Sequence, residues 1–350
     1  MFYTYPMALE KDLIAWYEVN RRHMPWREDP TPYHVYLSEI MLQQTQVDTV
    51  RAYYLRFLKA FPTIRDLAKG SEEDVLKLWE GLGYYSRGRN LHKAALEIVD
   101  RFQGEVPMGK EDLLSLPGIG EYTSRAIRSI AFHQKEIAVD GNLIRVYARL
   151  NEDSEDSLEK IKDSCEAYFK KELLQEDPSH FNQALMDIGE MVCLPKALPL
   201  CEKCPLRPYC QSAKDGTMLS YPSPKKAKEK QEENWTVLVY DFGGEFALEK
   251  RPENGLLASL YEFPLLAGKL TLDDIKKALK KEGISFSAVT DLGTAQHVFS
   301  HLVWDLQGYR ISLQAKPSNA SWVWATKAAM KKAYPVPSAF RYYLKAVGLK

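Results

Sequence analysis

The spacing of apolar residues changes once along this chain and divides it into two regions. From residue 8 to about residue 191, apolar side chains recur every three or four positions, as they do in amphipathic α-helices. The pattern predicts helices over residues 8–20, 34–47, 49–60, 72–80, 89–103, 141–150, 157–172 and 178–191, with a loop over 21–32. We therefore expect an all-helical front region.

Beyond residue 234 the apolar period shifts to two, which indicates β-strands. Strands are predicted over 235–240 and 245–250, on either side of Gly243-Gly244, and over 296–304, 309–313 and 322–325. Helices are predicted over 271–282 and 337–347, so the back region is expected to be α+β. Residues 214–234 are rich in Pro, Ser, Lys and Glu, which is typical of a linker. The predicted domains are residues 1–213 and 235–350.

A glycine turn within residues 116–142 is the most informative stretch of the front region. Pro117 and Gly118 end one helix, and Gly118 and Gly120 are expected to take positive φ angles in a tight turn. Such a turn at the start of a helix presents unpaired N–H groups to a phosphate. An ordinary helix–turn–helix corner is the alternative. Asp140, at the start of a helix some twenty residues later, favours the functional interpretation.

Composition and charge restrict the possible partners. The chain has 350 residues, zero formal net charge and no apolar run of membrane-spanning length, so we expect a cytoplasmic protein that does not bind membranes. Residues 221–350 carry 19 Lys+Arg and 13 Asp+Glu, which makes the back region basic and leaves the front region acidic by the same amount. Binding of nucleic acid by the front region would therefore depend on local features.

Four of the five cysteines lie within residues 193–210 and have the spacing C-x7-C-x2-C-x5-C. Four thiolates so close in sequence can hold a tetrahedral zinc ion or a four-iron cluster, and the spacing alone does not separate the two metals. The predicted ligands are Cys193, Cys201, Cys204 and Cys210. The fifth, Cys165, is expected to be a small core residue.

Two carboxylic acids of the front region are candidates for catalysis. Glu39 lies on a predicted helix, and Asp140 precedes Gly141-Asn142 at a helix start, where an aspartate cap is common. Singly, each is explained by ordinary helix structure. Together with the amide of Gln44, the aromatic ring of Tyr84 on a glycine turn and the cationic strip that begins at Arg87, they are the groups that a base-flipping enzyme needs. Glycosidic cleavage requires one acid for the leaving group and one carboxylate for the sugar cation.

The chain resembles the MutY-type adenine DNA glycosylases of the helix-hairpin-helix superfamily. The matching segments are Pro25-Trp26-Arg27, residues 38–47, 83–87, 116–123 and 139–142, and the four clustered cysteines. The resemblance implies a multidomain protein with an all-α helix-hairpin-helix glycosylase domain that carries an iron–sulfur cluster loop. It also implies a monomeric enzyme of base-excision repair that acts on double-stranded DNA containing an adenine mismatch.

The resemblance also assigns roles to individual residues. Glu39 would protonate the adenine ring, Asp140 would stabilise or covalently trap the sugar cation, and Tyr122 and Asn142 would support the site. Gln44 and Tyr84 would enter the duplex, and the cysteines would hold a [4Fe-4S] cluster. The expected DNA contacts in this region are Arg27, Gln44, Tyr84, Arg87, Gly118 and Gly120.

Tyr122 and the first cysteine spacing refine these expectations. Superfamily members that also break the DNA backbone carry a lysine at the position of Tyr122, whose amine forms a Schiff base. We therefore expect a monofunctional glycosylase that leaves an abasic site. The first spacing has seven residues where the family has six, and we expect the proline-rich loop to absorb the extra residue.

Residues 235–348 resemble the Nudix-like module of the same glycosylases, most clearly at residues 255–264. The next predicted helix, over 271–282, lacks the glutamates that hold magnesium in a Nudix hydrolase, so nucleotide hydrolysis is not expected. The resemblance assigns recognition of 8-oxoguanine opposite the adenine to Phe299, Ser300 and His301. Two alternatives remain, namely a glycosylase for another mismatched or oxidised base and a non-catalytic DNA-binding protein.

Overall fold

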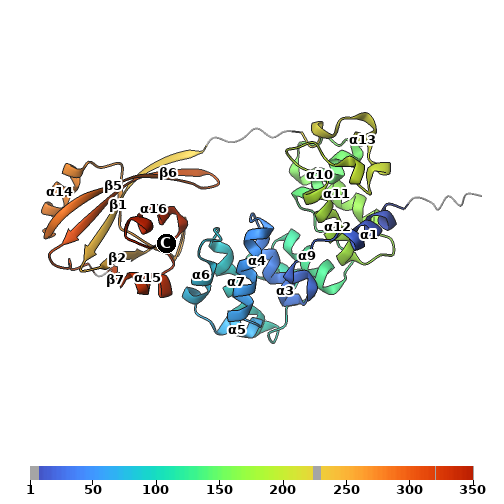
Figure 1. Cartoon of the computed structure of the whole chain (residues 1–350). Coiled ribbons are helices and arrows are strands. Elements are labelled where there is room, and N and C mark those ends of the chain that lie inside the picture. Colours follow the sequence, from blue (N-terminus) through green and yellow to red (C-terminus); the bar gives the residue numbers. More distant parts are fainter. Residues whose placement is uncertain (1–7, 224–229, 320, 350) are drawn as a thin grey trace, which may run out of the picture. The chain divides into compact units, whose positions relative to one another are not determined.

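The computed structural model describes residues 8–223, 230–319 and 321–349, which form two compact units (Figure 1). The first unit comprises the described residues of Met1–Ala68 and Lys93–Lys226, and it is helical. The second comprises Lys69–His92 together with the described residues of Ala227–Lys350, and it contains the β-sheet. The predicted division into a helical front and a β-rich back is confirmed at the level of secondary structure.

The helical region follows the predicted order closely. Its α-helices are α1 (Leu9–Asn20), α2 (Pro25–Glu28), α3 (Pro32–Leu42), α4 (Val47–Ala60), α5 (Ile64–Lys69), α6 (Glu72–Trp79), α7 (Ser86–Arg101), α8 (Lys110–Ser115), α9 (Glu121–Phe132), α10 (Gly141–Asn151), α11 (Leu158–Glu172), α12 (Pro178–Met191) and α13 (Gln211–Asp215). Short 3-10 turns are η1 (Cys201–Lys203), η2 (Arg207–Tyr209) and η3 (Met218–Ser220).

A hydrophobic core holds α1, α10, α11 and α12 together. It contains Leu13, Leu143, Phe169 and Phe181, whose side chains are fully or almost fully buried. The start of α12 is fixed locally, because the side chain of Asp177 accepts from the Ser179 backbone N–H and Pro178 occupies the first helical position. Position 165 also belongs to this core, as expected for its cysteine.

Two details of the predicted helices are wrong. Residues 21–32 are not wholly a loop, because Pro25 starts the one-turn helix α2. The helix predicted over 34–47 ends at Leu42, because Gln44 takes a left-handed φ of 55° that no α-helix accommodates. Residues 43–46 are therefore a turn between α3 and α4.

The hairpin between α8 and α9 has one of the two predicted positive φ angles. Gly118 has φ +80°, whereas Gly120 has φ −99° and ψ −178°, so the prediction for Gly120 is wrong. Gly120 is the N-cap residue of α9, and an N-cap takes an extended backbone. The space beside it is open, since no described heavy atom lies within 4 Å of the position that a Cβ would occupy.

A mixed seven-stranded sheet forms the centre of the second unit. Its strands are β1 (Gln231–Phe242), β2 (Glu245–Lys250), β3 (Tyr261–Glu262), β4 (Leu265–Ala267), β5 (Phe286–Val298), β6 (Leu302–Leu313) and β7 (Trp322–Thr326). The main order is β3-β2-β1-β6-β5, with β4 beside β1 and β7 beside β2. Strands β1 and β6 are parallel and the other pairs are antiparallel. Gly243 and Gly244 both have positive φ and close the predicted β1–β2 hairpin.

Helices cover both faces of this sheet. One face packs against α14 (Leu272–Lys281) through Ile275 and Leu279. The other packs against α15 (Lys327–Ala333), the 3-10 turn η4 (Ser338–Phe340) and α16 (Arg341–Ala346), which bury Phe340 and Tyr343. The strand predicted over 296–304 is confirmed at residues 296–298, which end β5, and at residues 302–304, which begin β6. It is wrong at residues 299–301, which form the turn that joins the two strands. That turn presents the three residues assigned to base recognition.

Among the described residues, no helix combines the length and the apolar character that crossing a bilayer requires.

Candidate active site

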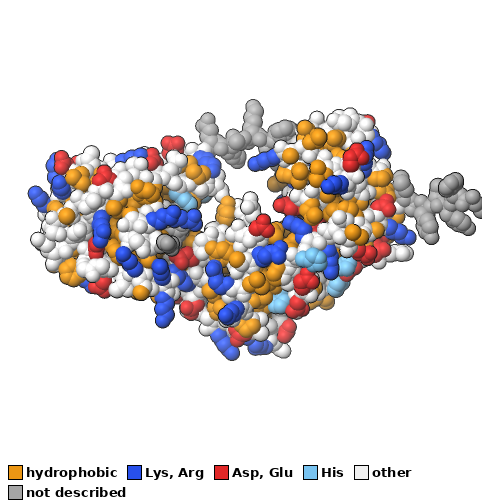
Figure 2. All heavy atoms as spheres, viewed as in Figure 1, with side chains coloured by type: hydrophobic (Ala, Val, Ile, Leu, Met, Phe, Trp, Pro, Cys, Tyr) orange, Lys and Arg blue, Asp and Glu red, His pale blue; other side chains and the backbone are white. Residues whose placement is uncertain are grey.

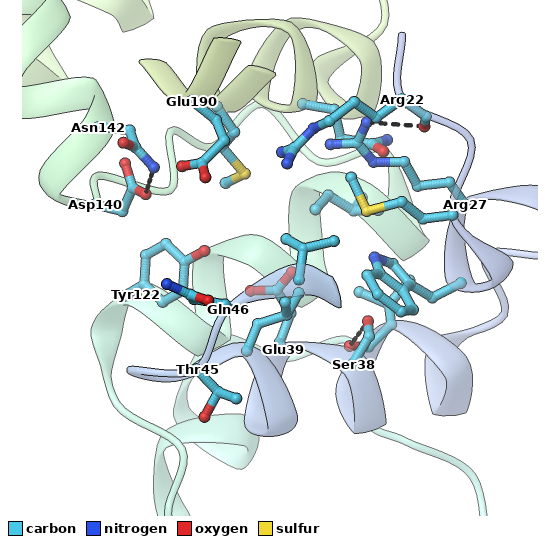
Figure 3. A pocket seen from close by; sticks show the side chains of 18 of the residues that line it. Arg22, Arg27, Ser38, Glu39, Thr45, Gln46, Tyr122, Asp140, Asn142 and Glu190 are labelled. Atoms are coloured by element: carbon cyan, nitrogen blue, oxygen red, sulfur yellow. Dashed lines mark hydrogen bonds between the residues drawn. The ribbon is translucent and has the colours of Figure 1, made fainter. Parts of the chain in front are cut away.

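A pocket of about 390 Å³ lies in the helical unit, and segments far apart in sequence build its wall (Figure 3). Glu39 reaches it from α3, Tyr122 from α9, and Asp140 and Asn142 from the start of α10. The structure thus brings together the four residues predicted as catalytic. The other lining residues are Arg22, Met24, Trp26, Arg27, Val35, Ser38, Leu42, Gln44, Thr45, Gln46, Val47, Ile130, Gln183, Met186 and Glu190.

Glu39 has the properties of a general acid. Its side chain is only 6 % exposed. Burial raises the pKa of its carboxyl to about 7, although a hydrogen bond from the Tyr122 hydroxyl favours the ionised form. The charge of Asp140 raises this pKa and the charge of Arg27 lowers it. Its Oε2 atom is buried without a hydrogen-bond partner among the described residues. The carboxyl can therefore carry a proton near neutral pH, and one of its oxygens makes no hydrogen bond to a described residue.

Asp140 is both a helix cap and a residue of the pocket wall, so the two interpretations of its sequence position do not exclude each other. As the N-cap of α10, its Oδ1 accepts from the Leu143 backbone N–H at 2.8 Å. Its Oδ2 accepts from the Asn142 side-chain amide at 3.0 Å. Burial raises the pKa of Asp140, and these two N–H donors oppose that effect because they favour the carboxylate form. The cap thus fixes the orientation of a carboxylate that also lines the pocket.

Tyr122 connects the two acids. Figure 3 shows its hydroxyl directed between Glu39 and Asp140. Burial and the negative charges of Glu39 and Asp140 raise the pKa of Tyr122 well above its usual value. The hydroxyl therefore stays protonated at neutral pH and donates to the Glu39 carboxyl.

A chain of hydrogen bonds leads from Asp140 to the first clustered cysteine. The amide oxygen of Asn142 accepts from Arg145 Nη2 at 2.8 Å, and Arg145 Nε donates to the carbonyl of Cys193 at 2.7 Å. Arg145 Nη2 also donates to the Gly189 carbonyl at 2.6 Å. A Cβ at Gly189 would lie 2.5 Å from the Asn142 Cβ, so only glycine lets α12 approach Asn142 this closely. The orientation of Asp140 therefore depends on the segment that carries Cys193.

A buried ion cluster forms the opposite wall. Asp187 on α12 is fully buried and accepts from Arg22 Nε at 2.7 Å and from Arg27 Nη1 at 2.7 Å. Arg27 was predicted to contact DNA, and the structure places it in the pocket wall with 10 % of its side chain exposed. Pairing with Asp187 fixes the guanidinium near Glu39, whose pKa it lowers.

The remaining DNA-contact candidates of the helical unit lie around the pocket and the hairpin. Gln44 lines the pocket from the turn after α3, where its positive φ turns the chain. Gly118 and Gly120 lie in the α8–α9 hairpin and do not line the pocket. The open space beside Gly120 leaves the hairpin backbone accessible at that point.

The other candidates belong to the second unit. Tyr84 is 44 % exposed with φ +46°, and its hydroxyl lies 2.6 Å from Ser300 Oγ. Arg87 is 7 % exposed and packs its guanidinium 5.4 Å from the ring centroids of Trp79 and Tyr84. It also donates to the Gly83 carbonyl at 3.1 Å, so it holds the turn that presents Tyr84.

The recognition loop is the β5–β6 turn of residues 299–301. Phe299 is half-buried and packs its ring 5.1 Å from that of Trp304 in a T-shaped contact. The aromatic residue thus anchors the turn. Ser300 and His301 are exposed, and the Ser300 hydroxyl is hydrogen-bonded to Tyr84.

The comparisons with known proteins agree with this geometry. Residues 37–171 match the model of the HhH-GPD superfamily base excision DNA repair proteins, and residues 235–346 match the NUDIX domain. The adenine DNA glycosylase of Rattus norvegicus is 35 % identical over 94 % of this chain and 78 % of its own length. This chain belongs to the adenine DNA glycosylase family. The adenine DNA glycosylase of Buchnera aphidicola from Schizaphis graminum is 36 % identical over 76 % of the chain and 77 % of its own length.

The solved structure of another DNA glycosylase shares the helical fold. A thermostable thymine-DNA glycosylase aligns with a TM-score of 0.54 and 27 % identity, covering 59 % of this chain and 94 % of its own. The sequence likeness to adenine DNA glycosylases extends through both regions of the chain, whereas this structural likeness covers little more than half of it.

The four clustered cysteines meet the requirements of the cluster that the resemblance to adenine DNA glycosylases implies. All four line one small cavity, which Arg149 and Arg207 also line. Four thiols around one shared cavity are compatible with a multi-atom cluster, which would take one thiolate at each iron. Arg149 Nη1 donates to Cys193 Sγ at 3.2 Å, the kind of bond that stabilises a cluster thiolate.

Helix α12 supplies pocket residues that the sequence reasoning missed. Gln183 accepts from the Tyr17 hydroxyl at 3.2 Å and donates to Ser179 Oγ at 2.9 Å, so its amide is fixed at the pocket wall. Glu190 lines the pocket two turns further along the helix. Asp187, between them, does not line the pocket but binds Arg22 and Arg27, which do. The sequence does hold a signal for Asp187, because a charged residue within the apolar run 184–188 indicates a buried ion pair. Nothing in the sequence indicates that α12 lines the same pocket as α3.

Proposed function

We propose that this enzyme hydrolyses the N-glycosidic bond of adenine mispaired with 8-oxoguanine or guanine in double-stranded DNA. The observation that carries the proposal is the meeting of two carboxylic acids with different environments in one pocket. Glu39 is buried and shares no ion pair with a described residue, whereas Asp140 receives two N–H donors. Different environments allow one carboxyl to be protonated while the other is ionised. Glycosidic hydrolysis needs both forms, an acid for the leaving group and a carboxylate for the sugar cation.

Glu39 supplies the proton in this proposal. With a pKa of about 7, a substantial fraction of its carboxyl is protonated at neutral pH and can protonate a ring nitrogen of the extruded adenine. Protonation makes the base a neutral leaving group, so the bond to the sugar breaks with less charge separation. The Oε2 atom has no hydrogen-bond partner among the described residues, and in this proposal it bonds the base.

Asp140 stabilises the positive sugar that base departure leaves. Its carboxylate is oriented by Asn142 and by the Leu143 N–H before the substrate binds, so little reorganisation is needed in the transition state. The same carboxylate can attack the sugar carbon or act only through its charge. A water molecule then completes hydrolysis and leaves an abasic site.

The proposed enzyme does not cut the DNA backbone. Backbone cleavage by related enzymes needs an amine that forms a Schiff base with the sugar. The residues that line the described pocket include no lysine, and Tyr122 occupies the hairpin position that a lysine would hold. We therefore expect free adenine and an intact strand as the products.

We assign the remaining predicted residues to DNA and to the cofactor. Gln44 and Tyr84 would enter the duplex, and Gly118 and Gly120 would bind a phosphate through the hairpin backbone. Phe299, Ser300 and His301 would contact the base opposite the adenine. Arg27 would contact the extruded base and Arg87 would act through the Tyr84 turn. A [4Fe-4S] cluster held by Cys193, Cys201, Cys204 and Cys210 would order the segment that supports Arg145.

The Glu39→Gln variant tests the assignment of the acid. Glutamine preserves the shape of the side chain but cannot donate a carboxyl proton, so we expect adenine release to fall below detection. Binding to an adenine mismatch duplex should persist, because the glutamine amide fills the same space and the other proposed DNA contacts are unchanged. Adenine release at the wild-type rate would exclude Glu39 as the acid.

A further inference from the structure

An open groove of about 380 Å³ lies on the second unit, and none of residues 299–301 lines it. One side is the end of β5 and the other is η4 with the short helix α16. Its polar lining residues are Gln296, His297, Ser338, Arg341, Tyr342 and Lys345, and no lining residue is acidic. The groove therefore combines two cationic side chains and a histidine with hydroxyl and amide groups.

Local structure directs the basic side chains to the same place. Arg341 and Lys345 are four residues apart on α16, so they share one face of the helix, and both are exposed. Tyr343 fixes α16 against the sheet, because its hydroxyl donates to the Gly293 carbonyl at 3.3 Å. A Cβ at Gly308 would lie 2.0 Å from the Tyr343 ring, so the helix approaches the sheet as closely as glycine allows.

His297 completes the basic wall from the strand side. Ala295, Gln296 and His297 line the groove from the end of β5, and Arg341 lines it from the start of α16. Burial lowers the pKa of His297, and the positive charge of Arg341 lowers it further. Figure 2 shows Lys and Arg side chains gathered, with a histidine, in the region that α16 occupies in Figure 1.

The groove is continuous with the recognition loop. The His297 ring packs 4.6 Å from the Phe299 ring at an interplanar angle of 75°. Two residues of an extended strand span about 7 Å, which equals roughly two base-pair steps of duplex DNA. A DNA strand whose base contacts residues 299–301 would therefore carry its backbone past the groove.

We propose that this groove binds the phosphodiester backbone of DNA on the strand that carries the base opposite the adenine. The choice of strand rests on the proposed function, whereas the backbone contact does not. Arginine, lysine and hydroxyl groups donate to phosphate oxygens, and a wall without carboxylates does not repel them. Because the chain has no net charge, affinity for DNA has to come from local sites of this kind.

The test compares two double variants of the full chain. Arg341→Gln with Lys345→Gln removes two charges from the groove, and Lys280→Gln with Lys281→Gln removes two exposed charges from α14 on the opposite face of the sheet. Binding to a fully matched duplex is measured over a range of salt concentrations. The slope of log K against log salt is negative, and each lost phosphate contact reduces its magnitude by about 0.9. The magnitude of the slope should therefore be smaller by up to about 1.8 in the groove variant than in the wild type. Its affinity at low salt should fall roughly tenfold, since each released contact contributes a few-fold.

The matched duplex separates this proposal from the proposed function. It contains no mispaired adenine, so the binding result stands even if the wild-type chain releases no adenine. A single Lys345→Glu variant should also weaken binding, and unchanged melting temperatures would establish that each variant is folded. Equal affinities and equal salt slopes for the groove variant and the α14 variant would overturn the proposal.

Discussion

Arg145 donates a hydrogen bond of 2.8 Å to the side-chain oxygen of Asn142, and Asn142 in turn donates to Asp140. Arg145 is 9 % exposed and its other bonds go to the carbonyls of Gly189 and Cys193. The Asp140 carboxylate, which we propose to be catalytic, is therefore positioned through Asn142 by a side chain that is itself held by the cysteine segment. A structural change around Cys193 reaches Asp140 through two side chains.

Replacing Arg145 with Gln should lower the single-turnover rate of adenine release about 10- to 100-fold, as the loss of such supporting hydrogen bonds does elsewhere. Asn142 would lose the partner that orients its amide. Gly189→Ala should have the same effect by a different route, because its Cβ would displace Asn142. Both rates are measured at saturating enzyme. Wild-type rates in both folded variants would show that Asn142 needs no such support.

The rate of adenine release should depend on pH through Glu39. Its carboxyl must be protonated to act, and its pKa is about 7, so the single-turnover rate should fall tenfold per unit above that pH. In Tyr122→Phe the hydrogen bond that favours the ionised form is lost, so the pKa rises and the midpoint moves to higher pH. Tyr33→Phe is the matched control, since that hydroxyl bonds the Phe61 carbonyl outside the pocket. A midpoint that stays fixed in Tyr122→Phe would contradict the assignment.

Glu39 should also lower the free energy of unfolding at high pH. Its pKa rises from 4.5 in the unfolded chain to about 7 in the fold, so the folded state opposes ionisation. The cost is absent below the unfolded value, grows between the two values and is complete above pH 7. A shift of this size corresponds to roughly 3 kcal/mol. Glu39→Gln should therefore raise the free energy of unfolding by up to that amount at pH 8 and leave it nearly unchanged at pH 4. The measurement is denaturant unfolding followed by helical circular dichroism, and an equal difference at both pH values would contradict it.

Much of the fold could be predicted because local patterns determine it. The bounds of α1 and α12 follow from apolar spacing and, for α12, from the Asp177-Pro178 start. The end of α3 could not be predicted, because Gln44 adopts a left-handed conformation that its residue type only weakly favours. The β5–β6 turn could not be predicted either, because Phe299 is apolar and continues the alternating pattern of a strand.

The sequence indicated the residues of the pocket that stand in recognisable motifs. It did not indicate the residues that reach the pocket only through the packing of distant helices. Glu39, Tyr122, Asp140 and Asn142 all reach one pocket, as the resemblance implied. The supporting role of Arg145 and the contributions of α12 arise only when helices distant in sequence pack together. No local pattern reports which face of α12 meets the start of α10.

The metal content should follow the clustered cysteines. Purified protein should show broad visible absorption and contain four irons and four sulfides per chain, as expected for a [4Fe-4S] cluster. Cys204→Ser should lose both the absorption and the iron. Cys165→Ser is the matched control, because that thiol is buried in the helical core away from the cluster cavity. A colourless protein with one zinc ion per chain would contradict the assignment.

The central claim is tested most directly by single-turnover release of adenine from duplexes that differ only in the opposing base. The account predicts fast release opposite 8-oxoguanine, slower release opposite guanine and little opposite thymine, with the strand intact until the abasic site is treated with alkali. Ser300→Ala combined with His301→Ala should reduce the ratio of the first two rates. Release of another base in place of adenine, or strand cleavage at the same rate as base release, would contradict the account.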